Sequence, residues 1–87
     1  MIPIDFDAIV FKERETYVAY CPELDVSSCG STVEHAKEML RTAVRLFLDE
    51  AERMGTLGDI LEEANYRKDE SGRWMPPKLV LSELVSL

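Results

Sequence analysis

Residues 31–55 read STVEHAKEMLRTAVRLFLDEAERMG, and this stretch predicts one long amphipathic helix. Ser31 and Glu34 have the spacing of a capping box, in which each side chain bonds the backbone amide of the other. Gly55 is the expected left-handed stop. A helix of about 23 residues spans roughly 34 Å, enough to cover one face of a small sheet. Apolar residues recur three and four apart: Val33, Ala36, Leu40, Ala43, Val44, Phe47, Ala51 and Met54.

Three further apolar residues of this helix, Met39, Leu46 and Leu48, lie off that stripe. The helix therefore has more apolar surface than one sheet contact requires. We expect the surplus to form part of an oligomer or partner surface.

Upstream of the helix, the pattern predicts three strands. Apolar residues alternate with polar ones from Ile2 to Val10, and β-branched and aromatic residues fill 16–21. The polar residues 12–15 between them predict a hairpin turn. After a break at Pro22-Glu23-Leu24-Asp25, residues 26–29 form a short third strand that ends at Gly30.

Downstream of the helix, residues 56–64 predict a shorter helix that ends at Asn65, followed by a turn at 68–72. Pro76 and Pro77 exclude a helix, and residues 79–87 alternate as a closing strand. The expected order is β-β-β-α-α-β in a single domain, residues 1–87. The predicted fold class is α+β, an antiparallel sheet covered on one face by a long helix.

Composition narrows the classes of function. The chain has 46% hydrophobic residues, a net charge of −7, and neither a membrane-length apolar run nor a signal peptide. We therefore expect a folded cytoplasmic protein. Affinity for duplex nucleic acid depends on cations that neutralise phosphates, so the charge favours a basic protein partner instead. Lys37, Arg41 and Arg45 share a helix with many carboxylates and predict a mixed, solvated face.

Few residues are candidates for chemistry. Cys21 and Cys29 fall in predicted strands, lack basic neighbours and are expected to be buried free thiols. His35 is the only histidine and is expected to be an exposed helix residue. We therefore expect no enzyme activity, no catalytic residue, no cofactor and no metal site.

An alternative interpretation is that the chain is the remnant of a nuclease that depends on a divalent metal ion. Asp5 and Asp7 lie two apart on one predicted strand, so their carboxylates point to the same face, and Glu23 or Asp25 could join them around Mg²⁺. The simpler reading is that they form the solvated side of a half-buried strand.

Two motifs carry a family resemblance. The segments YVAYCPEL (17–24) and GSTVEHA (30–36) resemble the strand and helix start of HicB-like antitoxins, and the similarity continues to about Gly55. The resemblance implies a partial ribonuclease-H-like domain without catalytic activity. It also implies that the domain binds a small basic toxin that cleaves messenger RNA, and covers its active site. Such antitoxins assemble as homodimers or homotetramers.

The chain departs from this family at its C-terminal end. Many members carry a ribbon-helix-helix or helix-turn-helix module that binds the operator, whereas residues 66–87 are too few and too strand-like for either. We therefore expect no direct DNA binding by this chain. A stand-alone HicB-like oligomer without a toxin partner is a further alternative.

The expected partner-binding residues lie in the resembling segment and near the C-terminal turn. Aromatic side chains are enriched at binding hot spots, and carboxylates suit a basic partner. Trp74 could equally pack against Tyr66 as a small satellite of the core. The predicted set is Tyr17, Tyr20, Glu23, Asp25 and Trp74.

Overall fold

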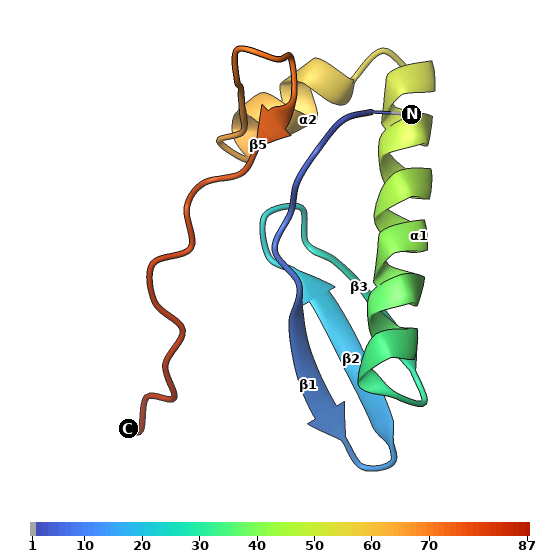
Figure 1. Cartoon of the computed structure of the whole chain (residues 1–87), viewed down its shortest axis with the longest axis vertical. Helices are drawn as coiled ribbons and strands as arrows, with labels where there is room; N and C mark the ends of the chain where they lie inside the picture. Colours follow the sequence, from blue (N-terminus) through green and yellow to red (C-terminus); the bar gives the residue numbers. More distant parts are fainter. Residues whose placement is uncertain (1) are drawn as a thin grey trace.

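The computed structural model describes residues 2–87 and confirms the predicted α+β class. A three-stranded antiparallel sheet in the order β1-β2-β3 is followed by a long helix that packs on it (Figure 1). A short helix and a two-stranded sheet complete the chain. The elements are β1 (Ile9–Glu13), β2 (Thr16–Cys21), β3 (Val26–Gly30), α1 (Val33–Arg53), α2 (Leu57–Glu63), β4 (Arg67–Lys68) and β5 (Trp74–Met75).

The β1–β2 hairpin sets the register of the sheet. Its turn is Arg14-Glu15, and Arg14 has φ 57°. Ile9 pairs with Tyr20 and Glu13 with Thr16, so the strand residues face one another in pairs. Because successive side chains alternate between faces, this register places Ala19 and Cys21 on the face toward α1.

Small residues let α1 approach the sheet closely. Ala19 and Ala36 are fully buried, and a Cβ added to Gly30 would lie 2.5 Å from the backbone nitrogen of Ala36. Leu40 and Val44 then fill the space between α1 and the strands. Burial of an aliphatic side chain of this size stabilises the fold by about 1.5–3 kcal/mol.

The helix begins one residue later than the sequence pattern predicts. Thr32, rather than Ser31, is the N-cap, and its hydroxyl accepts a hydrogen bond of 3.0 Å from the His35 amide. The His35 ring is exposed, as expected, and its Nδ1 accepts a bond of 3.1 Å from the Ser31 amide. Thr32 and His35 therefore take the two roles that the capping box assigned to Ser31 and Glu34.

The ends of both helices agree with the sequence. Gly55 follows α1 with φ +76°, and Asn65 follows α2 with φ 64°. Glycine adopts this left-handed conformation without steric cost, and asparagine tolerates it better than most residues.

The apolar stripe of α1 is shifted from the prediction. Leu48, expected off the stripe, is buried, whereas Val33, Phe47 and Met54 are exposed. Met39 and Leu46 are exposed, as predicted. The shift arises because α1 packs mainly on β2 and β3, while Leu48 turns toward the N-terminal segment.

The expected first strand is mostly wrong in position. Residues 2–8 form no strand, and only Ile4 makes an isolated parallel bridge, to Trp74. β1 starts at Ile9, and its five residues pair with residues 16–20 of β2. Ile2, Ile4 and Phe6 still pack on the core, as the alternation of apolar residues indicates.

The expected closing strand over residues 79–87 is also wrong. The last strand is instead β5, which pairs with β4 around the turn that begins at Asp69. From Pro76 onward the described chain forms no helix or strand and leaves the body of the fold as an extended tail (Figure 1).

No helix in residues 2–87 combines the length and apolar character that crossing a membrane requires.

The cap geometry predicts unequal effects of two neighbouring substitutions. Thr32→Ala removes the hydroxyl that satisfies an orphan helix amide, so we expect a loss of about 1 kcal/mol in the free energy of unfolding. Ser31→Ala removes a side chain outside the cap and is expected to change it by less than about 0.5 kcal/mol. Urea unfolding followed by circular dichroism measures both. Equal losses, or a larger loss for Ser31→Ala, would contradict this assignment of the cap.

Candidate interaction surface

Within residues 2–87, one face of the three-stranded sheet is not covered by another helix or strand. α1 lies on the face that carries Ala19 and Cys21, and neither α2 nor the β4–β5 pair makes extensive contact with the strands. By strand alternation and register, the opposite face carries Ile9 and Phe11 of β1, Val18 and Tyr20 of β2, and Cys29 of β3. Phe11 is 53% exposed. We call this set of five residues the open face.

Carboxylates flank the open face at both ends. Glu13 follows Phe11 on the same side of β1, and Asp25 lies in the β2–β3 turn beside Tyr20. Asp7 precedes β1, with the same alternation as Ile9. The only basic residue in the adjoining β1–β2 turn is Arg14, which is next to Glu15. An apolar centre with an acidic border suits a basic partner that has an apolar patch of its own.

Two of the predicted partner-binding residues meet on this surface. The Tyr20 hydroxyl donates a hydrogen bond of 3.0 Å to Asp25 Oδ1. This bond, to a carboxylate, raises the pKa of Tyr20 above its ordinary value. Asp25 adopts φ 54°, a conformation that carboxylate side chains tolerate. The pair holds an aromatic ring and a negative charge in a fixed arrangement at the edge of the open face.

Glu23 lies beside the same turn but is directed inward. Its carboxylate accepts from the Asp7 amide at 3.3 Å and from the Cys21 thiol at 3.4 Å. Desolvation raises the pKa of Glu23, and the neighbouring Asp7 side chain raises it further. Desolvation also raises the pKa of Cys21, to about 12. Glu23 therefore ties the segment before β1 to the β2–β3 turn, while being half-buried itself.

The other two predicted partner-binding residues lie elsewhere. Tyr17 is on the sheet face toward α1, where its ring packs on the core and lies 5.8 Å from Lys12 Nζ. Trp74 packs on the core from β5, with Lys68 Nζ 5.1 Å from its ring. The structure therefore places Tyr20 and Asp25 together and does not bring Tyr17 or Trp74 to them. Ile9, Phe11, Val18 and Cys29 make up the rest of the open face, and the period-two pattern with the hairpin turn was the signal that could have found them.

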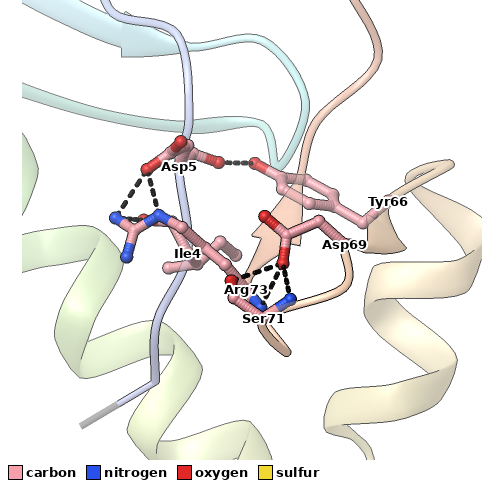
Figure 2. A network of polar contacts seen from close by, with 6 residues as sticks. All are labelled: Ile4, Asp5, Tyr66, Asp69, Ser71 and Arg73. Atoms are coloured by element: carbon pink, nitrogen blue, oxygen red, sulfur yellow. Dashed lines mark hydrogen bonds and ion pairs between the residues drawn. The ribbon is translucent and has the colours of Figure 1, made fainter.

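The residues of the nuclease alternative are engaged in separate contacts. Arg73 donates to Asp5 Oδ1 from Nε at 2.8 Å and lies at 2.6 Å through Nη2 (Figure 2). Asp7 instead faces Glu23. Within residues 2–87, no group of three or more His, Cys, Asp or Glu side chains is arranged to hold a metal ion. The Asp5 carboxylate is therefore engaged in an ion pair with Arg73 in the folded chain.

Figure 2 shows the polar network that anchors the N-terminal segment. The buried Tyr66 donates from its hydroxyl to the Asp5 carbonyl at 2.9 Å, and burial raises the pKa of Tyr66. Asp69 Oδ1 accepts from the amides of Ser71 and Arg73, and the Ser71 contacts lower the pKa of Asp69. The network holds the β4–β5 turn against residues 4 and 5.

A hollow of about 370 Å³ lies between the N-terminal segment and α1. Ile4, Phe6 and Leu48 supply apolar walls, and Arg41 and Arg45 border it. Arg41 is already bonded to Glu38 at 2.9 Å, which agrees with the predicted mixed, solvated character of the basic helix residues.

The two cysteines differ in exposure, which corrects the expectation that both are buried. Cys21 is fully buried on the face toward α1, whereas Cys29 is exposed on the open face. Both are free thiols. The reason is strand alternation: Cys29 pairs with Val18, not with the inward residues of β2.

Comparisons with protein-family models, with curated proteins and with solved structures returned no match to this chain.

The thiols are expected to react at very different rates. At pH 8 a group with a pKa of about 12 is ionised in about one molecule in ten thousand, and Cys21 is also shielded from solvent. Titration of the native protein with Ellman's reagent should show one fast thiol per chain. Cys29→Ser should remove the fast phase, and Cys21→Ser should leave it. A fast phase that survives Cys29→Ser would contradict the orientation of β3.

Glu23 should make stability fall with rising pH. Its pKa is raised in the folded state, so the stability that its protonated form contributes is present below the ordinary carboxyl pKa and is lost as pH rises through the folded-state value. Glu23→Gln cannot ionise, so its melting temperature minus that of the parent should increase between about pH 4 and pH 7. Glu62→Gln, at an exposed position of α2, is the control and should show no such trend. A difference that is constant or decreases with pH would contradict the buried position of Glu23.

Proposed function

We propose that this chain is a non-catalytic protein-binding domain of the HicB-like antitoxin kind. Its partner is a small basic toxin that cleaves messenger RNA, and the domain inhibits that toxin by covering its active site. The proposed complex forms on a homodimer or homotetramer of this chain. The proposal rests on the resemblance of residues 17–24 and 30–36 together with the character of the open face.

The observation that carries the proposal is the uncovered sheet face with its acidic border. A sheet whose outer face is in contact with water alone would be expected to carry polar side chains on that face. Here Ile9, Phe11 and Val18 face away from α1 beside Tyr20; Phe11 is exposed and the other three are half-buried. Contiguous exposed apolar side chains with a polar border are characteristic of protein-binding surfaces.

Charge supports the choice of partner. The net charge of −7 and the carboxylates of Asp7, Glu13 and Asp25 favour a cationic surface. Ribonucleases that bind the RNA backbone need such a surface, because neutralising phosphates dominates their affinity. A domain that mimics the negative charge of RNA can therefore compete for the same site.

The mechanism requires area and complementarity, not reactive side chains. Tyr20, held by Asp25, presents an aromatic ring that loses little conformational freedom on binding. Phe11, 53% exposed, would lose most of its contact with water in a complex. Electrostatic attraction speeds the encounter, and burial of the apolar centre slows dissociation.

The test uses the basic protein encoded by the reading frame next to this one. The full chain should bind it in a fixed ratio and stop its cleavage of RNA. Phe11→Glu should weaken binding at least tenfold by placing a charge in the apolar centre of the complex. Leu46→Glu is the matched control on the exposed side of α1, where Leu46 is 63% exposed, and should change the affinity less than twofold.

Three outcomes would refute the proposal. The neighbouring reading frames could encode no small basic protein, or that protein could cleave RNA equally well in the presence of this chain. The purified chain could itself cleave RNA in a manner that Asp5→Asn or Asp7→Asn abolishes.

A further inference from the structure

The tail from Leu79 to Leu87 is unusual for its exposed apolar side chains. Val80 is 86% exposed and Leu84 is 94% exposed. Between Leu79 and Leu87 the only charged side chain is Glu83. Such a segment is costly to leave in water and has the composition of a strand that pairs with a partner.

Just before the tail, Trp74 of β5 pairs in parallel with the N-terminal segment of the same chain, and the tail could continue this pairing. Ile4 and Trp74 form a parallel bridge: Trp74 N–H donates to the Pro3 carbonyl at 2.9 Å, and Asp5 N–H donates to the Trp74 carbonyl at 3.0 Å. If the same parallel register continued along the chain, residue 79 would lie beside Ile9, and residues 79–83 would run along β1.

The ladder ends at Trp74 because Pro76 lacks the donor of the next bond, and the groups that would continue the ladder have other partners. The next donor would be the amide of residue 76, but Pro76 has no N–H. The acceptor for that bond, the Asp5 carbonyl, already receives the Tyr66 hydroxyl at 2.9 Å. The bond after it would use the Asp7 amide, which donates to the Glu23 carboxylate.

Pro77 reinforces the break, since two successive prolines fix φ near −65° and hold the backbone extended. The tail therefore leaves β5 and runs apart from its own sheet, on the side away from α1 (Figure 1). The outer edge of β1, Ile9–Glu13, stays without a pairing strand in the described chain.

We propose that the tail of one copy pairs with the outer edge of β1 of a second copy, and that this reciprocal exchange forms a homodimer. Pro76 and Pro77 act as the hinge that prevents a tail from closing on its own chain. This inference specifies how the copies in the proposed homodimer are joined, and the strand exchange itself does not require that a toxin is bound.

A second copy is the occupant that fits best. Each copy carries both an apolar tail and a free edge, so one two-fold contact satisfies both pairs of surfaces. Nine extended residues span roughly 30 Å, more than the roughly 17 Å of the five residues of β1.

β3, the other edge of the sheet, is a poorer acceptor. Its middle residues are Ser27, Ser28 and Cys29, which offer little apolar contact area. The β1 edge instead carries Val10 and Phe11 and borders the open face. Leu81 and Val85 of the tail would extend that apolar surface on the dimer.

The test is the mass of the full chain in solution, measured by light scattering during size-exclusion chromatography. At about 100 µM the parent should have twice the 9.9 kDa mass of one chain. The double variant Leu81→Glu, Val85→Glu should have the mass of one chain with an unchanged helical circular dichroism signal. Leu46→Glu, the exposed control on α1, should stay dimeric.

A second variant tests the hinge separately. Pro76→Val with Pro77→Thr restores the missing amides. The Asp5 carbonyl can accept a second hydrogen bond, and the Asp7 amide can exchange its 3.3 Å bond to Glu23 for a backbone partner, so the tail can close on its own β1 and the mass should shift toward one chain. A parent that is monomeric, or a dimer that survives Leu81→Glu, Val85→Glu, would overturn strand exchange. A proline variant that remains fully dimeric would overturn the role of the hinge.

Discussion

The fold depends on the close packing of one helix against one face of a three-stranded sheet. Gly30 leaves no room for a side chain beneath the start of α1, and Ala19 and Ala36 bring the two layers together. A single helix covers only one face of the sheet. The elements α2, β4 and β5 lie beyond one end of the sheet and do not cover its other face (Figure 1). The uncovered face is therefore a consequence of the architecture, and its apolar residues are available to a partner.

The same constraint explains the distribution of polar contacts. The N-terminal segment does not join the three-stranded sheet. It is held by two backbone bonds to Trp74 and by side chains: Tyr66 and Arg73 bind Asp5, and Glu23 binds the Asp7 amide. These contacts use the backbone groups that a further strand would need. The apolar tail is released as a result, and the open face and the β1 edge together make up the surface on which the proposed assemblies form.

Much of the fold could be predicted because local signals and packing agree. Gly55 and Asn65 end their helices in the left-handed conformation, and the apolar spacing of residues 33–54 indicated the long helix. The cap was misplaced by one residue because Ser31 and Thr32 are both good caps, and the bond from the His35 amide to the Thr32 hydroxyl identifies Thr32 as the cap.

The errors arise where long-range contacts decide the outcome. Residues 79–87 have the pattern of a strand, but Tyr66, 61 residues from Asp5 in sequence, occupies the carbonyl that the pairing would require. The open face could be predicted only in part, because a pattern of alternation does not reveal which side the helix will cover. Tyr20 and Asp25 were predicted from the resembling segment, whereas placing Phe11 and Val18 beside Tyr20 needed the register of the hairpin.

The central claim is that the open face of the sheet, not the solvent-exposed side of α1, binds the basic partner. Backbone amide shifts of the ¹⁵N-labelled chain, recorded during titration with the neighbouring gene's product, test it most directly. The largest changes should fall on β1, β2 and the turn at Asp25. Changes confined to the solvent side of α1, between Glu34 and Arg53, would contradict it.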